Sequence, residues 1–417
     1  REMKILFISL GCDKNLVDSE VMLGLLTKNG YTLTDDETQA DVIVINTCCF
    51  IHDAKEESIN TILEMAQYKE QNLKALVVAG CLAERYKDEI LKEIPEIDAV
   101  LGTTSYDSIV EAVNMALAEN AGEHFEHYES IDYLPDNSEV ERVVTTGNHM
   151  AYLKIAEGCD KRCSYCIIPK IRGHFRSVPM EELLNEAKRL ASEGVKELVL
   201  VAQETTLYGK DLTGEKQLPL LLHELCKIEG IEWIRLLYCY PEEITDELIE
   251  AIKTEEKVCN YIDMPIQHSE DRILQRMGRR TSREDLVAVI KKLRQEIPDI
   301  TIRTTLITGF PGESEEDHEG LMNFVEECKF DRLGVFTYSP EEDTLAATFE
   351  DQIDEEVKEA RRDELMSLQQ EISYEHTQQL VGKTIKVMVE GYLFEDDIYV
   401  GRSYMDAPKV DGCVFIN

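Results

Sequence analysis

The sequence predicts an α/β protein in which two segments of parallel sheet precede a small β module. Short apolar runs alternate with helical patterns over residues 1–118, and the alternation resumes on a larger scale over residues 148–350. From residue 382 the tail changes to short β-like runs. Strand–helix alternation is typical of parallel sheets covered by helices. At 417 residues the chain is long enough for two or three domains.

Residues 1–118 are expected to form a small doubly wound α/β domain. Its strand candidates, each followed by a helical pattern, are KILFISLGC, DVIVINTC, ALVVAGCLAE and IDAVLG. The helical pattern after the third of these is ERYKDEILKEI. Residues 119–147 carry eight acidic residues against a single arginine and show little periodicity. We therefore expect an acidic linker or surface excursion there.

Residues 148–375 are expected to form a partial (β/α)6 barrel. Six strand candidates alternate with helices: AYLKIAEGC, ELVLVAQE, WIRLLYCYP, YIDMPIQH, TIRTTLITGFPGE and RLGVFTYSP. In such barrels the chemistry lies at the carboxyl ends of the strands. A polar helix is predicted near residues 354–380. Residues 376–417 are expected to form a small β module, apparently truncated, from the runs TIKVMVEGY, DIYVGRS and CVFIN.

Hydropathy, net charge and cysteine content indicate the location and the possible partners of the protein. No run approaches the roughly 18–20 apolar residues of a membrane span, and the first residues lack a signal-peptide layout, so we expect a cytoplasmic protein. The net charge of −39 repels phosphate backbones and favours basic partners, although such a charge can also serve solubility alone. Twelve cysteines in a reducing compartment indicate metal binding or catalysis rather than disulfides.

Three cysteines lie close together in the run EGCDKRCSYC. Cys159, Cys163 and Cys166, which we call the loop triad, follow the first strand candidate of the barrel. Three thiolates on one loop can each bind a different iron of a 4Fe–4S cluster and leave the fourth iron open. A zinc knuckle is the alternative, but zinc normally takes four ligands. The nearest further candidate, His174, lies beyond a turn, so the spacing favours the cluster.

A second set of cysteines is spread along the N-terminal domain. Cys12, Cys48 and Cys81, which we call the strand-end triad, each end a predicted strand. Parallel strands end at one edge of their sheet, so these side chains can converge there and hold a second cluster. Cys49 is expected to point away from its neighbour and is left out. We interpret the remaining cysteines as small packed residues: Cys226, Cys239, Cys259, Cys328 and Cys413.

The loop triad has the CX3CX2C spacing, with Tyr165 before the last cysteine. It resembles the signature of the radical S-adenosylmethionine superfamily. The resemblance implies that the open iron binds the amino and carboxylate groups of S-adenosylmethionine. An electron from the cluster then cleaves the cofactor to a 5′-deoxyadenosyl radical, which abstracts hydrogen. In such enzymes the cofactor supplies the chemistry and the protein positions it.

Two motifs at predicted strand ends are candidates for binding S-adenosylmethionine, together with Tyr165. In ITGFPGE, Gly309 and Gly312 would allow close backbone approach to a ligand, and Glu313 could accept a hydrogen bond. In VAQETTLYG, Gln203 and Glu204 are expected on the same rim. Each motif taken alone could equally be an ordinary strand-end turn.

The runs SLGCDKN, INTCCF, AGCLAERY, EGCDKRCSYC, IIPKIRG and ITGFPGE together resemble the methylthiotransferases over nearly the whole chain. The resemblance implies three domains, the last a TRAM domain, and two 4Fe–4S clusters, held by the strand-end triad and the loop triad. It also implies insertion of a methylthio group at an unactivated C–H bond, which needs two molecules of S-adenosylmethionine. A sulfur source and an external electron donor, a reductase or a flavodoxin-like protein, are implied as well.

Two branches of this family differ in substrate, and the tail distinguishes them. GRSYMDAPKVDGCVFIN, DMPIQHSEDRILQRMGR and NTCCFIHDA resemble the branch that modifies an aspartate β-carbon of ribosomal protein S-twelve, a basic protein. The alternative branch modifies an isopentenylated adenosine of transfer RNA. Residues 382–417 carry four basic and six acidic side chains, a net charge of −2, and lack the basic patch expected of a nucleic-acid binder. We therefore expect a protein substrate; a non-catalytic iron–sulfur scaffold is the alternative from a different class.

Overall fold

The computed structural model describes residues 2–118 and 123–417. Residue 1 of the predicted N-terminal domain and residues 119–122 of the predicted linker lie outside the described residues. The chain divides into two compact units. The first comprises Arg1–Gly147, Ala156–Arg162 and Cys166–Asn185, and the second comprises Asn148–Ile155, Cys163–Tyr165 and Glu186–Asn417. The boundaries predicted for the three domains stay a prediction.

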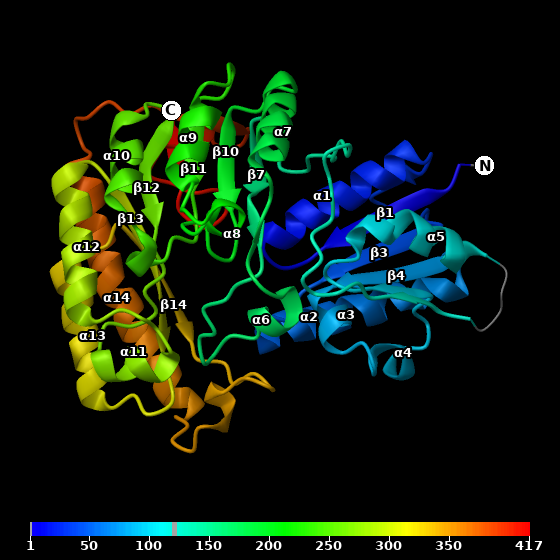
Figure 1. The fold of residues 1–417 in the computed structure, drawn as a ribbon, viewed down its shortest axis with the longest axis horizontal. Helices are drawn as coiled ribbons and strands as arrows, with labels where there is room; N and C mark the ends of the chain where they lie inside the picture. Colours follow the sequence, from blue (N-terminus) through cyan, green and yellow to red (C-terminus); the bar gives the residue numbers. More distant parts are fainter. Residues whose placement is uncertain (1, 119–122) are drawn as a thin grey trace. The chain divides into compact units, whose positions relative to one another are not determined.

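The first unit is built on a six-stranded parallel sheet with the order β2-β1-β3-β4-β5-β6 (Figure 1). The strands are β1 (Lys4–Ser9), β2 (Thr32–Leu33), β3 (Val42–Thr47), β4 (Ala75–Gly80), β5 (Ala99–Leu101) and β6 (Phe125–His127). The helices are α1 (Asp13–Lys28), α2 (His52–Ala66), α3 (Cys81–Arg85), α4 (Ile90–Glu93), α5 (Ile109–Leu117) and α6 (Ile168–Arg172). The order reverses at β1, as expected for a doubly wound sheet.

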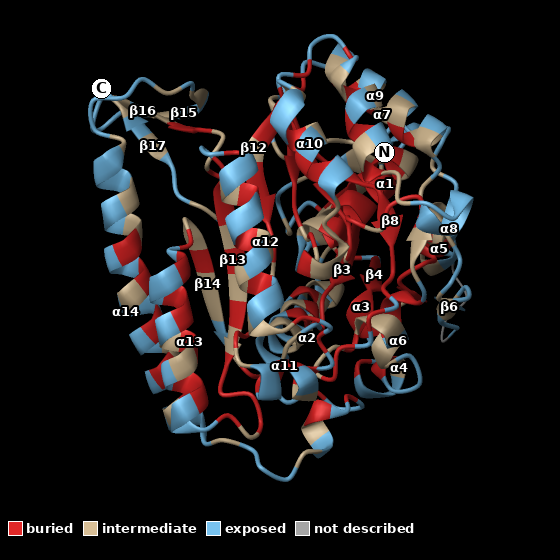
Figure 2. Cartoon of the chain, turned by 60° about the vertical axis from the view of Figure 1, so that its left-hand side comes forward, coloured by how far each residue is buried: buried red, intermediate tan, exposed pale blue. Residues whose placement is uncertain are grey.

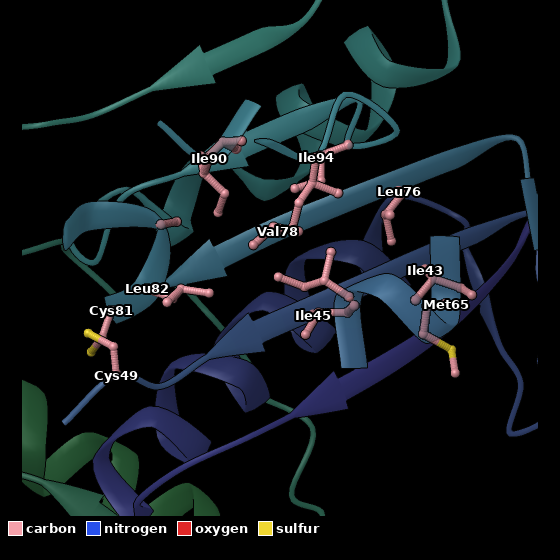
Figure 3. Close-up of a cluster of buried hydrophobic side chains, with 14 of the residues drawn as sticks. Ile43, Ile45, Cys49, Met65, Leu76, Val78, Cys81, Leu82, Ile90 and Ile94 are labelled. Carbon is pink, nitrogen blue, oxygen red and sulfur yellow. The ribbon is translucent and has the colours of Figure 1, made fainter. Parts of the chain in front are cut away.

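Helices cover both faces of this sheet because its central strands are apolar on both sides. One face packs Ile43, Ile45 and Val78 against side chains of α2, α3 and α4 (Figure 3). The opposite face packs Val44 and Val77 against side chains of α1 and α5. Both β3 and β4 are buried along their whole length, as expected for strands inside a parallel α/β sheet.

The acidic segment that follows α5 is more ordered than the sequence predicts. Phe125–His127 form β6, which pairs with β5 in parallel, and Arg142 forms a buried ion pair with Glu20 of α1 at 3.5 Å. The segment is thus ordered at β6, which is intermediate in burial or exposed along its length, and at the buried Arg142, while its role as a linker stays a prediction. A three-residue strand carries too little alternation to be recognised in sequence. The single helix expected over ERYKDEILKEI is likewise two short helices, α3 and α4.

The second unit is built on six parallel strands that follow the chain order β7-β10-β11-β12-β13-β14, as expected for an open (β/α)6 barrel. The strands are β7 (Met150–Lys154), β10 (Glu197–Val201), β11 (Trp233–Leu236), β12 (Val258–Asp263), β13 (Thr301–Thr308) and β14 (Arg332–Thr337). Between them lie α8 (Lys210–Thr213), α9 (Leu218–Cys226), α10 (Asp246–Thr254), α11 (Asp271–Met277), α12 (Arg283–Glu296) and α13 (Glu315–Cys328). Figure 2 shows β12 and β13 largely buried, with the outer faces of α12 and α14 exposed.

The predicted polar helix and β tail complete this unit. Helix α14 (Glu355–Gln379) packs against β14 and α13. The tail forms a three-stranded antiparallel sheet of β15 (Met388–Leu393), β16 (Ile398–Arg402) and β17 (Val414–Ile416). Helix α7 (Met180–Ser192) runs across the division between the two units, and the short strands β8 (Ala156–Glu157) and β9 (Arg176–Ser177) pair within the first unit.

Buried charges attach the tail sheet to the barrel strands inside the second unit. Glu197 of β10 has no exposed side-chain surface and pairs with Arg235 of β11 at 2.9 Å and with Arg402 of β16. Arg402 also pairs with Glu390 at 2.8 Å, and Arg235 donates to the carbonyl of Tyr404 at 2.6 Å. Moving the tail away would separate these pairs and leave buried charges without a partner, which is costly. The network therefore holds the tail sheet against the barrel strands.

Candidate active site

The strand-end triad lies at the carboxyl edge of three neighbouring strands. Cys12 is the N-cap of α1 after β1, Cys48 directly follows β3, and Cys81 directly follows β4 as the first residue of α3. The strand order β1-β3-β4 makes these strands adjacent, and Thr47 and Gly80 stand opposite one another in the register. The sheet thus brings the three positions to one edge.

Two glycines with positive φ allow the strand ends to approach closely. A Cβ atom on Gly11 (φ 89°) would lie 2.7 Å from Cβ and 2.9 Å from Sγ of Cys48. A Cβ atom on Gly80 (φ 96°) would lie 2.4 Å from Oδ1 of Asn46 and 2.6 Å from the carbonyl oxygen of Thr47. Only glycine tolerates both this conformation and this proximity. The glycines therefore explain how the segments before Cys12 and Cys81 reach the end of β3.

Three cysteine thiols at this edge form a donor set whose chemistry fits an iron–sulfur cluster. Cys48 and Cys81 are buried and Cys12 is exposed; burial raises the pKa of the Cys48 and Cys81 thiols. In the part of the chain that the structure describes, no three His, Cys, Asp or Glu side chains are grouped to hold one metal ion. In a 4Fe–4S cube each cysteine binds a different iron; the assignment of these three cysteines to a cluster stays a prediction.

Cys49 is completely buried and packs in the same apolar cluster as Cys81 (Figure 3). Like Cys48 it lies beyond the end of β3, so strand alternation does not fix its direction. Of the cysteines expected to be small packed residues, Cys239, Cys259 and Cys328 are buried. Cys413 is exposed, and the expectation fails there because its segment follows the turn before β17.

A buried arginine accompanies the strand-end triad. Arg172, the last residue of α6, places Nη1 2.9 Å from Oδ2 of Asp18 and 3.3 Å from Oε2 of Glu157. Its Nη2 donates to Oδ1 of Asn15 at 3.1 Å. Burial raises the pKa of the Cys81 thiol, and the positive charge of Arg172 acts in the opposite direction. A buried cation thus lies within electrostatic range of the Cys81 thiol.

The loop triad lies on a segment whose residues are divided between the two units. Cys159 and Cys166 belong to the first unit, and Cys163 belongs to the second. On the first side, the backbone N–H of Cys159 donates to the carbonyl of Gly173 at 3.1 Å. On the second side, Ser164 donates from its backbone N–H to Met277 and from its hydroxyl to Arg276, both at 2.8 Å.

Tyr165 lies at the apolar wall of the second unit, against a core cluster that includes Met277 and Phe310. Arg279 is buried nearby, stacks 4.4 Å from the ring centroid of Tyr240, and lies within electrostatic range of Tyr165 and Cys163. A cation therefore lies near this cysteine as well.

The candidate rim residues lie at the same edge of the second sheet. Gln203 and Glu204 follow β10, and Gly309 follows β13, so all occupy the carboxyl ends of parallel strands. Glu204 is completely buried and accepts hydrogen bonds from the backbone and the hydroxyl of Thr206. Their contact with S-adenosylmethionine stays a prediction.

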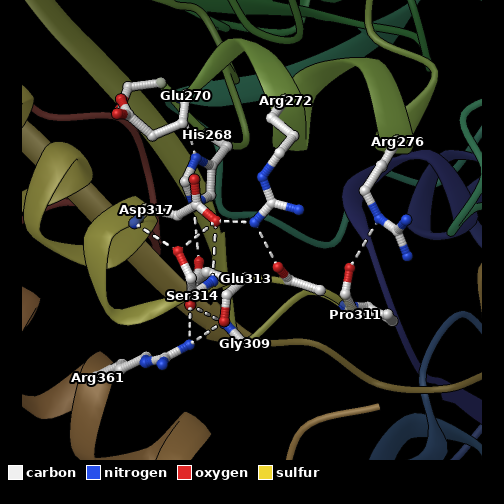
Figure 4. Close-up of polar contacts among 12 residues, drawn as sticks. His268, Glu270, Arg272, Arg276, Gly309, Pro311, Glu313, Ser314, Asp317 and Arg361 are labelled. Atoms are coloured by element: carbon white, nitrogen blue, oxygen red, sulfur yellow. Dashed lines mark hydrogen bonds and ion pairs between the residues drawn. The ribbon is translucent and has the colours of Figure 1, made fainter. Parts of the chain in front are cut away.

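Glu313 is held by a network inside the protein (Figure 4). Its carboxylate accepts from Nε2 of His268 at 2.7 Å, from the backbone N–H of Gly309 at 3.0 Å and from Arg361 at 2.8 Å. Burial opposes ionisation, but these hydrogen bonds outweigh it and hold the pKa of Glu313 below its usual range. A Cβ atom on Gly309 would lie 2.3 Å from Cγ of Lys358. These contacts give the motif a packing role, whereas its predicted cofactor role stays a prediction.

Sequence reasoning missed Arg172 and Arg279 as members of these sites. Both lie in runs that could have been examined, IPKIRG and RMGRRTS, which combine basic residues with turn glycines. Neither run indicates burial by itself, because arginine is mostly exposed unless it is paired.

None of the helices in the described part of the chain combines the length and the apolar character needed to cross a membrane.

Family descriptions match three parts of the chain. "Uncharacterized protein family UPF0004" matches residues 4–102, "Radical SAM superfamily" matches residues 153–325, and "TRAM domain" matches residues 381–417. With the barrel and the loop triad, these matches define a radical S-adenosylmethionine enzyme, a class that uses this cofactor and a 4Fe–4S cluster.

Relatives of high identity define the family more narrowly. The chain is 64% identical over 416 residues to the ribosomal protein uS12 methylthiotransferase RimO of Lachnoclostridium phytofermentans, covering 100% of this chain and 94% of that protein. It is 53% identical over 415 residues to RimO of Clostridium perfringens, covering 99% and 92%. The chain belongs to the RimO family of methylthiotransferases.

Solved structures share the fold at low identity. The radical S-adenosylmethionine methyltransferase TsrM from Kitasatospora setae, solved with tryptophan and a cofactor analogue, has a TM-score of 0.59 at 13% identity and covers 80% of this chain and 73% of its own. The cobalamin-dependent enzyme OxsB has a TM-score of 0.55 at 12% identity, covering 88% and 56%. These likenesses show the fold alone.

Proposed function

We propose that this enzyme transfers a methylthio group to the β-carbon of an aspartate in ribosomal protein uS12. The observation that carries the proposal is the 64% identity, over the whole chain, to a ribosomal protein uS12 methylthiotransferase. The tail and the overall charge support the same substrate class. We place the enzyme in the cytoplasm, where its substrate protein is made.

The proposal assigns one 4Fe–4S cluster to each triad. Cys159, Cys163 and Cys166 would hold the cluster that activates S-adenosylmethionine, and the strand-end triad would hold an auxiliary cluster. When bound, the two clusters supply radical formation and a site for the sulfur that is transferred. Two molecules of S-adenosylmethionine, a sulfur source and an external electron donor, a reductase or flavodoxin-like protein, complete the requirements.

The residues of the chain would serve mainly to hold and orient these groups. Ser164, through its bonds to Met277 and Arg276, fixes the backbone beside Cys163. Tyr165 keeps that side of the loop against apolar side chains and so excludes water. Gln203 and Glu204, Gly309 and Gly312, and Glu313 are proposed to line the cofactor pocket from the strand ends. No acid–base residue is assigned, because an unactivated C–H bond has no useful acidity for a general base.

Charge supports a basic protein as substrate. The chain carries a net charge of −39, and residues 382–417 carry four basic against six acidic side chains. An acidic enzyme attracts a basic ribosomal protein over long range and repels a polyanion. Several basic residues of the tail are also engaged within the protein, such as Arg402 with Glu197.

The experiment offers both substrate classes to the same enzyme. Reconstituted protein is incubated anaerobically with S-adenosylmethionine, sulfide, a reductant, and either a uS12 peptide or isopentenylated transfer RNA. We expect mass spectrometry to find CH3–S in place of hydrogen on the peptide alone. Modification of the RNA without modification of the peptide would overturn the proposal in favour of a transfer-RNA enzyme. Cleavage of S-adenosylmethionine without either product would contradict both.

A further inference from the structure

Arg172 is a buried charged residue of the first unit that bonds to side chains far away in the sequence, such as Asn15 and Asp18. Its side chain is 2% exposed, and it is among the largest fully buried side chains of the chain. It follows Cys166 by six residues and ends α6. Burial of a guanidinium is costly unless it is paired and hydrogen-bonded. The partners of Arg172 therefore determine why it can be buried at this position.

The partners of Arg172 come from both cysteine-bearing segments of the first unit. Asp18 and Asn15 lie on α1, the helix that Cys12 begins, and Glu157 lies two residues before Cys159. The pair between Arg172 and Glu157 closes the base of the loop that carries Cys159 and Cys166. One guanidinium therefore contacts the segment of each triad.

Asn15 links Arg172 to the ends of β1 and β3 by hydrogen bonds. Its Nδ2 donates to the carbonyl of Leu10 at 2.6 Å and to the carbonyl of Thr47 at 3.2 Å. These carbonyls lie next to the turns that lead into Cys12 and Cys48. Because Nη2 of Arg172 binds Oδ1 of the same amide, the arginine fixes the amide's orientation and, through it, the two turns.

The charge balance gives the arginine a second role. Asp18 and Glu157 place two carboxylates against the guanidinium of Arg172, which lies within electrostatic range of all three cysteines of the strand-end triad. Three thiolates around a cluster add negative charge, and reduction of the cluster adds more. A buried cation near these sulfurs favours the more negative, reduced form.

We propose that Arg172 is a positioning residue of the auxiliary cluster, which orients the turns of Cys12 and Cys48 through Asn15 and raises the reduction potential of the cluster bound there. The proposal rests on the proposed assignment of the strand-end triad as cluster ligands. Through Arg172, the segment that carries Cys159 would then affect the orientation of the Cys12 and Cys48 turns and the reduction potential of the auxiliary cluster.

The test uses the full chain with Cys159→Ala, Cys163→Ala and Cys166→Ala, so that iron binds only at the strand-end triad. This parent is compared with three further variants, Arg172→Gln, Arg172→Lys and Asp18→Asn, after anaerobic reconstitution. Iron content is measured first, and the midpoint potential follows from a redox titration monitored by electron paramagnetic resonance.

We expect Arg172→Gln to shift the reduction equilibrium at least tenfold towards the oxidised form, which is 59 mV for a one-electron couple. Arg172→Lys should shift it less, because the charge is kept while the forked hydrogen bonding is lost. Asp18→Asn should shift it in the opposite direction. A merely structural role would not produce shifts of opposite sign.

An iron-loaded Arg172→Gln variant with the parent's potential would overturn the proposal, as would shifts of the same sign in Arg172→Gln and Asp18→Asn. Loss of iron in Arg172→Gln but not in Arg172→Lys would support the positioning role. Loss in both, without an upward shift in Asp18→Asn, would overturn it. A parent that binds no iron would instead refute the ligand assignment, so the two failures are distinguishable.

Discussion

The closeness of the strand ends at the strand-end triad predicts a specific cost for adding one methyl group at Gly80. Gly80→Ala forces a non-glycine residue into a backbone conformation (φ 96°, ψ −159°) that is essentially limited to glycine, which costs about 1–3 kcal/mol. The new Cβ would also lie 2.4 Å from Oδ1 of Asn46 and 2.6 Å from the carbonyl oxygen of Thr47, and such overpacking costs about 1–3 kcal/mol more. The sum is about 2–6 kcal/mol of unfolding free energy.

Gly30→Ala provides the matched control. Gly30 also has a positive φ, 88°, but a Cβ atom there would meet nothing within 4 Å, so only the conformational cost of about 1–2 kcal/mol applies. The difference between the two variants, about 1–3 kcal/mol, therefore reports mainly the contact at the strand ends.

Hydrogen exchange of the apo protein measures this difference in the right part of the chain. Tryptophan fluorescence is unsuitable, because the single tryptophan, Trp233, lies in β11 of the second unit. The slowest amides of β3 and β4 report global opening of the first unit. We expect them to exchange roughly fivefold to a hundredfold faster in Gly80→Ala than in Gly30→Ala. Equal exchange in the two variants would refute the close packing of the strand ends.

Three further predictions follow from the charges of the second unit and of the whole chain. Glu197→Gln should destabilise the attachment of the tail by about 3–5 kcal/mol, since it leaves Arg235 buried without its carboxylate and Arg402 with Glu390 as its remaining carboxylate partner; limited proteolysis should cut the tail faster than in the exposed control Glu395→Gln, and equal rates would refute the role of the network. The lowered pKa of Glu313 means that its charge stabilises the fold above the unfolded value of about 4.3 and that this contribution is lost as the pH falls through the folded value; Glu313→Gln should therefore flatten the loss of stability in acid, measured as unfolding free energy against pH, and an unchanged slope would contradict the network. Binding of the basic uS12 protein should weaken as salt rises, because exposed charges are screened over a Debye length of roughly 8–10 Å; isothermal titration at two salt concentrations measures this, and salt-independent binding would speak against electrostatic attraction.

The positions of the strand-end triad could be predicted because they depend on topology alone. A cysteine after each of three parallel strands reaches the same edge whatever the side-chain packing, and the strand order β1-β3-β4 makes the three strands neighbours. Strand β6 was missed because Phe125–His127 are too few residues to alternate. The break between α3 and α4 has no breaker residue to mark it, and nothing in the structure explains it.

The remaining parts of the sites depend on contacts between residues far apart in sequence. Arg172 meets Asp18 across 154 positions, and the run IPKIRG does not indicate that its arginine is buried. The cofactor role expected for Glu313 stays a prediction, and nothing in the sequence indicates that His268 and Arg361 bind its carboxylate. Those partners are contributed by the segment after β12 and by α14, which sequence spacing does not connect with the motif.

The most direct test of the central claim, that Cys12, Cys48 and Cys81 hold a second cluster needed for sulfur insertion, is one mass-spectrometric measurement of two products. The variant with Cys12→Ala, Cys48→Ala and Cys81→Ala, which should bind about four irons instead of about eight, is incubated with S-adenosylmethionine, reductant, sulfide and the uS12 peptide. Cys49→Ala, with the cysteine next to Cys48 removed, is the control. We predict 5′-deoxyadenosine without methylthiolated peptide from the triple variant and both products from the control. Methylthiolated peptide from the triple variant would contradict the account.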